Sequence, residues 1–363
     1  MSGRITVAGD EPYDVVVRAG ALAEIERTVP DDVRRVALVH QAAVAGVVDT
    51  IEAALSHRIE TVRIEVPDGE AAKSAAVAIG AWDTLAVHGF TRSDLVIAVG
   101  GGAVTDVAGF IAATWLRGVR VVHVPTTLLA MVDAAVGGKT GININAGKNL
   151  VGAFHTPLAV ICDVSTLGSM PPADYAAGLA EVVKAGFIAD PVILTLIESD
   201  PAGAVTPSGP HTAELVVRAI AVKAAVVGAD LRERAAVGPG GLGREILNYG
   251  HTLAHAIEKR ENYQWRHGDA VAVGLVFAAA LANNAGCLDI ETAARHRVVL
   301  DSLGLPTSYP AEAWPQLRAA MSLDKKTRGR TLRFVVLEGL GRAKILSDPA
   351  TELLEKAYAE VAR

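Results

Sequence analysis

Cysteine is scarce in this chain, and an excess of positive charge is missing. Only Cys162 and Cys287 occur among 363 residues, and neither belongs to a CxxC spacing. So few cysteines argue against a disulfide framework and favour a reducing, cytoplasmic setting. The 34 lysines and arginines are outnumbered by 40 aspartates and glutamates, which gives a formal net charge of -6. No global positive field would hold nucleic acid or an anionic membrane, so any phosphate site must be local.

Long hydrophobic runs are also missing. The longest uncharged apolar run, Ala270–Ala282, has 13 residues, whereas about 20 are needed to span a bilayer. We therefore expect a buried core helix there and no membrane partner. The first ten residues contain a single arginine and no apolar core, so we expect no secretory signal.

The first half of the chain alternates short β-branched runs with alanine-rich stretches of helical period. With 51% hydrophobic residues the chain can bury a large core, and its length predicts two domains. The alternation predicts a Rossmann-like α/β domain with a mostly parallel sheet over residues 1–170, including an early hairpin around Gly9 and Asp10. The predicted strands are Ile5–Ala8, Tyr13–Arg18, Arg35–His40, Thr61–Val66, Leu95–Val99, Val119–Val124 and Ala159–Asp163.

From about Pro171 onward the pattern changes to long helical segments, which predicts a mostly α-helical domain over residues 171–363. One short β-like run, Leu332–Leu337, interrupts it. The predicted helices are Asp174–Ile188, Thr212–Val227, Arg244–Lys259, Asp269–Asn283, Glu291–Leu303 and Thr351–Val361.

The segment Pro125–Phe154 places isolated charges among small and apolar residues. Burying an unpaired ammonium is costly, so a plain core has little use for Lys139 and Lys148, whereas ligand phosphates would compensate them. Gly137–Gly141 resembles a P-loop, but the Walker pattern needs a glycine where Asp133 stands, which excludes kinase and ATPase functions. A glycine-rich turn with a solvated lysine is the simpler alternative.

A second glycine turn, Gly100–Asp106, follows an apolar run and opens a helix. Such a turn exposes backbone N–H groups and the positive end of the helix to a pyrophosphate. The G-x-G-x-x-G fingerprint is incomplete because Thr105 occupies the last glycine position. No acidic residue follows the run at Arg35–Val39, where His40 and Gln41 stand, so the usual ribose contact is not expected there. A tight turn without a ligand is the alternative.

The third group of motifs contains histidines. His251 and His255 are four residues apart and would share one helix face, which suits either two metal ligands or one ligand beside its partner. His267 adds a third imidazole, and Glu181 is a carboxylate in an apolar helix with Lys184 on the same face. HxxxH alone is only moderately specific, since such histidines can also simply bond neighbouring groups on a helix.

Together these motifs resemble the 3-dehydroquinate synthase family of sugar-phosphate cyclases, and most of all its actinobacterial members. The resemblance covers nearly the whole chain and implies a dehydroquinate synthase-like fold. The segments that carry it are Gly100–Asp106, Arg117–Gly118, Pro125–Leu129, Val132–Asn143, Gly147–Phe154, Gly178–Gly186, Arg244–Thr252, His267–Gly268 and Asp324–Lys326.

The resemblance implies two cofactors and a role for each matching residue. A divalent metal, zinc or cobalt, would be held by Glu181, His251 and His267, while His255 would bond the substrate. Contacts with NAD are implied for Asp68, Glu70, Lys73, Gly101, Gly102, Asp106, Thr126, Thr127, Lys139, Lys148, Thr166 and Ser169. The implied catalytic and substrate-binding residues are Asp133, Lys139, Asn149, Lys184, Arg244, Asn248 and His255, with Arg117 and one of Lys325 or Lys326 on the phosphate.

The implied reaction converts a small sugar phosphate, 3-deoxy-D-arabino-heptulosonate 7-phosphate, into 3-dehydroquinate and phosphate, in an enzyme expected to be a homodimer. Cyclases that make valiolone or inosose products and metal-dependent alcohol dehydrogenases are the rival enzymes. The lysine-rich pocket disfavours a simple alcohol substrate, and a regulatory protein without chemistry would lack a ligand or lysine, of which none is missing. One departure from the family lies in Asp230–Arg244, a longer and glycine-rich segment in which Glu233 is the candidate for a displaced family glutamate.

Overall fold

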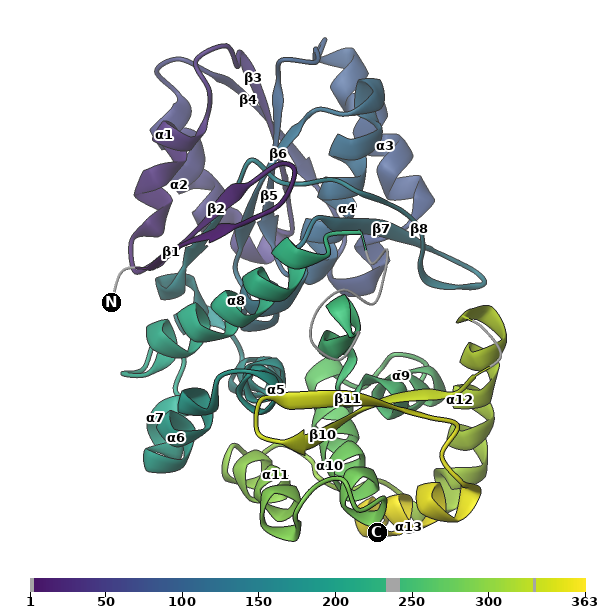
Figure 1. Ribbon diagram of the computed structural model, residues 1–363. Helices are drawn as coiled ribbons and strands as arrows, with labels where there is room; N and C mark the ends of the chain where they lie inside the picture. Colours follow the sequence, from purple (N-terminus) through teal and green to yellow (C-terminus); the bar gives the residue numbers. More distant parts are fainter. Residues whose placement is uncertain (1–2, 233–241, 329–330) are drawn as a thin grey trace. The chain divides into compact units, whose positions relative to one another are not determined.

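The computed structural model describes residues 3–232, 242–328 and 331–363, and it leaves the side chains of 323–328 undescribed (Figure 1). The chain forms two compact units. The first contains Met1–Met170 and Thr212–Arg232, and the second contains Pro171–His211 and Glu233–Arg363. Helix α8 (Thr212–Ala229) thus groups with the first unit, although residues of the second flank it in the sequence.

The first unit is built on a seven-stranded sheet in the order β1-β2-β9-β6-β5-β3-β4. The pairs β2–β9, β9–β6, β6–β5, β5–β3 and β3–β4 are parallel, and β1–β2 is the antiparallel hairpin expected from the sequence. The mostly parallel α/β fold is therefore confirmed. The strands are β1 Gly3–Val7, β2 Tyr13–Arg18, β3 Arg35–His40, β4 Glu60–Glu65, β5 Leu95–Gly100, β6 Arg120–Pro125 and β9 Ala159–Asp163.

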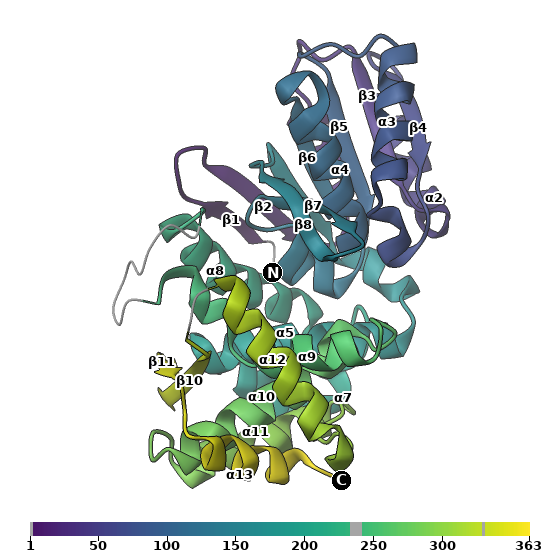
Figure 2. The same ribbon diagram turned by 90° about the vertical axis from the view of Figure 1, so that its right-hand side faces the viewer.

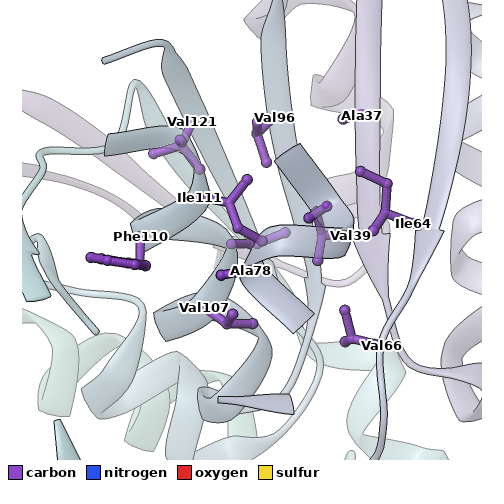
Figure 3. Close-up of a cluster of buried hydrophobic side chains, with 14 of the residues drawn as sticks. Ala37, Val39, Ile64, Val66, Ala78, Val96, Val107, Phe110, Ile111 and Val121 are labelled. Atoms are coloured by element: carbon purple, nitrogen blue, oxygen red, sulfur yellow. The ribbon is translucent and has the colours of Figure 1, made fainter. Parts of the chain in front are cut away.

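Helices cover both faces of this sheet, which explains the uninterrupted apolar strands. Neighbouring residues of β5 point to opposite faces: Val96 joins one buried cluster and Ile97 the other. The first cluster also contains Ala78 of α3 and Ile111 of α4 (Figure 3), and Figure 2 shows these helices on one side of the sheet. The second cluster includes Ile51 of α2. The helices are α1 Ile25–Thr28, α2 Ala45–Leu55, α3 Ala75–Val87 and α4 Gly102–Thr114.

A second hairpin was not expected from the sequence. Strands β7 (Lys139–Ile144) and β8 (Gly147–Phe154) pair antiparallel within the charged Pro125–Phe154 segment. Ile142 is buried in the first cluster, whereas most of β8 is exposed. The hairpin lacks the strict alternation of a half-buried strand, so periodicity could not reveal it.

The second unit is mostly helical, as predicted, around helix α10 (His267–Asn284). Residues 270–282, the longest apolar run, are all buried in it, which confirms the expected core helix. Among the described residues, no helix combines the length and the apolar character that crossing a membrane requires. The other elements are α5 Pro172–Ile188, α6 Pro191–Ser199, α7 Pro201–Ala204, α9 His251–Arg260, α11 Ile290–Ser302, α12 Trp314–Arg328, α13 Thr351–Val361 and the hairpin of β10 Arg333–Gly339 with β11 Arg342–Ser347.

The single helix predicted over Arg244–Lys259 is wrong. The structure has a 3-10 helix, Gly243–Asn248, followed by α9, which begins at His251. Gly250 separates them with φ of 78°, a left-handed conformation that glycine adopts without steric cost. A side chain at Gly250 would also lie 2.9 Å from the backbone nitrogen of Leu275, so this break is tied to the packing of α9 on α10.

Replacing Gly268 with alanine should destabilise the second unit. A Cβ at Gly268 of α10 would lie 1.7 Å from the carbonyl oxygen of Ala177 on α5, so the two helices must separate. We expect a loss of about 1–3 kcal/mol or more in the free energy of unfolding, measured in urea. Metal affinity should fall as well, because His267 and Glu181 lie on these helices. Gly80→Ala, on α3 with nothing within 4 Å of the added Cβ, is the control and should not lower stability.

Candidate functional site

Glu181 on α5 lies at the centre of a cluster of titratable side chains in the second unit. Its Oε1 atom is 3.3 Å from Nε2 of His251 and 3.4 Å from Nε2 of His267. Its Oε2 atom contacts the ammonium of Lys184, one turn along the same helix. One potential ligand atom from each of Glu181, His251 and His267 lies within 4.8 Å of the others. The carboxylate is 4% exposed, so water cannot replace these partners.

The outer nitrogens of both imidazoles have partners of their own. Nδ1 of His251 lies 3.0 Å from the carbonyl oxygen of Tyr249, which can only accept, so Nδ1 donates to it and Nε2 is the nitrogen that faces Glu181. Nδ1 of His267 lies 3.4 Å from Oε2 of Glu258. A carbonyl or carboxylate behind an imidazole is the usual way in which proteins orient a metal-binding histidine.

The buried Oε1 of Glu181 accepts no hydrogen bond from the described residues. A buried acceptor of this kind is rare, because an unmet hydrogen bond in the interior is costly. The oxygen instead faces two imidazole nitrogens, and one carboxylate with two imidazoles is a donor set typical of a catalytic zinc site with an open position. The residues present therefore fit a divalent metal.

Neighbouring charges fix the protonation of the cluster. Burial alone would raise the pKa of Glu181, but the ammonium of Lys184 and the imidazole of His251 hold it well below its usual range. Burial would lower the pKa of His267, but the carboxylates of Glu181 and Glu258 outweigh it and raise this pKa to about 10. The metal-free protein thus holds a charged carboxylate beside a protonated imidazole.

Metal affinity should consequently rise with pH. His267 must lose its proton to bind a cation, and with a pKa of about 10 it is protonated at neutral pH in the metal-free protein. Below that pKa, each unit of pH should increase the apparent affinity by about tenfold. Competition with a chelator of known pH dependence, at pH 7 and pH 8, measures this. An affinity that stays constant would show that His267 is neutral or is not a ligand.

His255 stands beside the trio without belonging to it. Its ring centroid is 5.4 Å from that of His251, one turn away on α9. The metal-candidate group consists of Glu181, His251 and His267 and leaves His255 out. The helix spacing alone allowed both histidines of the pair to be ligands, so the arrangement favours the family's ligand set over that alternative.

In the first unit, the glycine turn Gly100–Asp106 joins β5 to α4 at the carboxyl edge of the sheet. Thr126 follows β6, and its backbone nitrogen donates to the carbonyl of Gly100 at 2.9 Å. A Cβ at Gly101 would be 3.4 Å from Thr127, so these threonines and the turn lie side by side. Gly101 and Gly102 are partly exposed, and backbone N–H groups at the start of a helix are typical ligands of an anion such as a pyrophosphate.

Of the other residues expected to bind NAD, Lys139 and Lys148 lie on β7 and β8. The rest lie on or beside α4 and two 3-10 helices that follow strands. Gly69–Ala72 follows β4, and Lys73 directly after it pairs with Asp106 of α4 at 2.5 Å. Val164–Ser169 follows β9 and contains Thr166, whose hydroxyl donates to the carbonyl of Asp163, and Ser169. In parallel strands the carboxyl ends share one edge, so both segments belong to the edge that carries the glycine turn.

Sequence reasoning missed Lys223. This lysine of α8 has a side chain only 9% exposed, and its ammonium contacts both the carboxylate and the backbone carbonyl of Asp133. Asp133 lies in the short π-helix Ala130–Ala134, a form often found at functional sites. The signal was available, because Lys223 is an isolated charge in an apolar helix, as Lys184 is.

The remaining predicted residues occupy three separate segments. Arg244 is 5% exposed in the 3-10 helix that ends at Asn248. Arg117 follows α4 with a positive φ of 68°. Lys325 and Lys326 lie on α12 with side chains outside the described part of the chain, and Glu233 lies outside the described residues altogether.

Comparison with known proteins finds the 3-dehydroquinate synthase family over nearly the whole chain. The family model for the 3-dehydroquinate synthase N-terminal region matches residues 63–177, and the C-terminal model matches 178–327. A 3-dehydroquinate synthase of Streptomyces avermitilis is 57% identical over 355 residues, which cover 98% of this chain and 96% of the relative.

Two solved structures share the fold. One is 2-deoxy-scyllo-inosose synthase complexed with carbaglucose-6-phosphate, NAD+ and Co2+, with a TM-score of 0.86, 26% identity and coverage of 99% and 100% of the two chains. The other is 2-epi-5-epi-valiolone synthase from Streptomyces hygroscopicus with NAD+ and Zn2+, with a TM-score of 0.86, 27% identity and 96% coverage of both chains.

Proposed function

The chain belongs to the 3-dehydroquinate synthase family, and from this premise we infer that it converts 3-deoxy-D-arabino-heptulosonate 7-phosphate into 3-dehydroquinate and phosphate. It is a carbon–oxygen lyase of the shikimate pathway, and it depends on NAD and on a divalent metal, zinc or cobalt. The observation that carries the proposal is the buried Glu181 oxygen that faces His251 and His267, in a chain that also has the glycine turn of a dinucleotide site.

The metal would be held by Glu181, His251 and His267. When both groups are bound, the metal acidifies a substrate hydroxyl and NAD takes up and returns a hydride, so that phosphate elimination becomes possible. Tyr249 and Glu258 orient the two imidazoles through Nδ1, so that each Nε2 would be available to hold the cation.

NAD would lie on the glycine turn, with its pyrophosphate at the start of α4. We propose that Gly101, Gly102, Thr126 and Thr127 contact it through the backbone and hydroxyl groups at this edge. Lys73 holds Asp106 in place through their ion pair. The further proposed contacts are those of Asp68, Glu70, Lys139, Lys148, Thr166 and Ser169.

Cationic side chains would bind the substrate's carboxylate and phosphate and stabilise the charge that develops during elimination. Lys184 gives one N–H to Oε2 of Glu181 and keeps two for a substrate oxygen. Lys223 similarly orients Asp133. We propose substrate contacts for Lys139, Asn149, Arg244, Asn248, His255, Arg117 and one of Lys325 or Lys326.

Sequence identity favours this function over the functions of the related cyclases. The chain is 57% identical to a 3-dehydroquinate synthase, against 26–27% for the inosose and valiolone synthases. Incubation with the heptulosonate phosphate, NAD and Zn2+ should release phosphate and yield 3-dehydroquinate in equal amounts. Phosphate release from a hexose 6-phosphate, with none from the heptulosonate phosphate, would instead assign the chain to another kind of cyclase.

We also propose the cytoplasm as the location and a homodimer as the assembly, both on the basis of the family. Residues 1–170 would form the NAD-binding domain, and 171–363 the metal- and substrate-binding domain. Helix α8 is the exception in this division, since it packs with the first unit and brings Lys223 to Asp133.

A further inference from the structure

Asn143 lies at an irregularity in the β7–β8 hairpin. Ile142 pairs with Val151 and Ile144 pairs with Gly147, so the register shifts between them and Asn143 has no partner in the ladder. A bulge of this kind turns a side chain out of the regular alternation, and bulges are frequent beside active sites.

Three hydrogen bonds connect Asn143 to residues that the proposed function uses. Its backbone N–H donates to the carbonyl of Lys73 at 2.7 Å. Its side-chain Nδ2 donates to Oε2 of Glu70 at 2.6 Å, and its Oδ1 accepts from the backbone N–H of Asn149 at 3.0 Å. One residue thus joins the segment Glu70–Lys73 to the start of β8, which contains Asn149.

The start of β8 is held by contacts with the same residues. Asn149 has a φ of 55°, a left-handed conformation that asparagine adopts more readily than most residues with a side chain. Lys148 beside it lies 3.5 Å from the other carboxylate oxygen of Glu70. The bonds from Asn143 and Glu70 therefore hold in place two side chains that face the ligands in our proposal.

We propose that Asn143 is a positioning residue that couples the NAD-binding segment Glu70–Lys73 to the start of β8, which contains Lys148 and the proposed substrate contact Asn149. The inference rests on the proposed function for the identity of the two ligands. An amide is required, because the side chain must donate to a carboxylate and accept from an N–H at once. Aspartate would place a second carboxylate against Glu70, and leucine would make neither bond.

The coupling predicts which kinetic constants respond. The ligand contacts of both segments depend on the side chain of Asn143. Its loss should therefore weaken the binding of NAD, the binding of the substrate, and the effect of each ligand on the affinity for the other. For Asn143→Asp and Asn143→Leu, we expect the KM for the heptulosonate phosphate and the Kd for NAD to rise by about 10-fold, with a smaller change in kcat. Asn145→Asp is the matched control, because Asn145 is exposed in the same hairpin, and its constants should stay at the wild-type values.

A second variant reverses the direction of the hydrogen bond. In Glu70→Gln combined with Asn143→Asp, the amide of residue 70 donates to the carboxylate of residue 143, whose other oxygen still accepts from Asn149. The double variant should bind NAD more tightly than Asn143→Asp alone and recover part of the KM. Glu70→Gln alone serves as the reference, since Glu70 itself is a proposed NAD contact.

NAD titration by calorimetry, without substrate, and steady-state kinetics of phosphate release test the proposal. Thermal unfolding shows which variants fold. If Asn143→Leu does not fold, the double variant provides the test. Wild-type Kd and KM values in Asn143→Asp, or a double variant no better than Asn143→Asp, would overturn the role of Asn143. Failure of the wild-type protein to release phosphate would instead contradict the proposed function, and the NAD titrations would still decide the role of Asn143.

Discussion

Replacing His267 with alanine should abolish tight metal binding and lower turnover by at least about 10³-fold. A catalytic metal contributes several kcal/mol of charge stabilisation, and each 1.36 kcal/mol corresponds to about a factor of ten in rate. His267 is one of three candidate ligands, and its Nε2 lies 3.4 Å from Oε1 of Glu181. With one nitrogen ligand removed, a single imidazole and a carboxylate would remain to hold the cation.

The fold should survive this substitution. His267 is the first residue of α10 and its side chain is 25% exposed, so its loss leaves no large internal cavity. His57→Ala, an exposed histidine that also faces a glutamate, is the matched control. Metal content by emission spectroscopy, circular dichroism and phosphate release should be measured on both variants. Wild-type turnover in His267→Ala, or in the wild type after dialysis against chelator, would refute the metal assignment.

Replacing Lys184 with methionine should produce the second-largest effect. The ammonium of Lys184 and the carboxylate of Glu181 are 4% exposed each and in contact. Removing one partner of a buried ion pair leaves an uncompensated charge and typically costs about 3–5 kcal/mol. In the metal-free variant, we expect a loss of that size in the free energy of unfolding, and a rise in the pKa of Glu181, since burial then acts with less opposition.

Metal should restore part of the stability of Lys184→Met, because a bound cation compensates the same carboxylate. Turnover should nevertheless stay about 10²-fold below the wild type, since the ammonium donors that we propose for the substrate are gone. Urea unfolding with and without Zn2+, together with phosphate release, measures both effects. Lys344→Met, which breaks the exposed pair with Glu338, should cost no more than about 1 kcal/mol. Equal stability of both variants without metal would contradict this account of the buried pair.

Sequence patterns predicted the sheet of the first unit well, because strands such as β3 and β5 are apolar runs buried on both faces. They failed where a contact distant in the sequence decides the backbone. The break at Gly250 depends on the packing of α9 against Leu275 of α10, which no local pattern reports. The β7–β8 hairpin is partly exposed and rich in glycine, so it has no clear period.

The residues of the candidate site likewise fall into those that sequence patterns could predict and those that they could not. Isolated charges in apolar segments drew attention to Glu181 and Lys184, and the structure places them in contact. Spacing could not tell which histidine of the pair joins Glu181, because that depends on how α5, α9 and α10 pack. Lys223 and Asn143 act through partners 90 and 73 residues away, Asp133 and Glu70 respectively, so only the three-dimensional arrangement reveals these partners.

The central claim is that one protein oxidises and then reduces the same substrate, so that NAD is regenerated in every turnover. The most direct test supplies the zinc-loaded protein with NAD at about one equivalent and the heptulosonate phosphate in large excess, while phosphate and NADH are followed together. We expect many equivalents of phosphate per NAD, an equal amount of 3-dehydroquinate and no accumulation of NADH. Phosphate release that stops at one equivalent, or NADH that accumulates in step with an oxidised product, would contradict the claim.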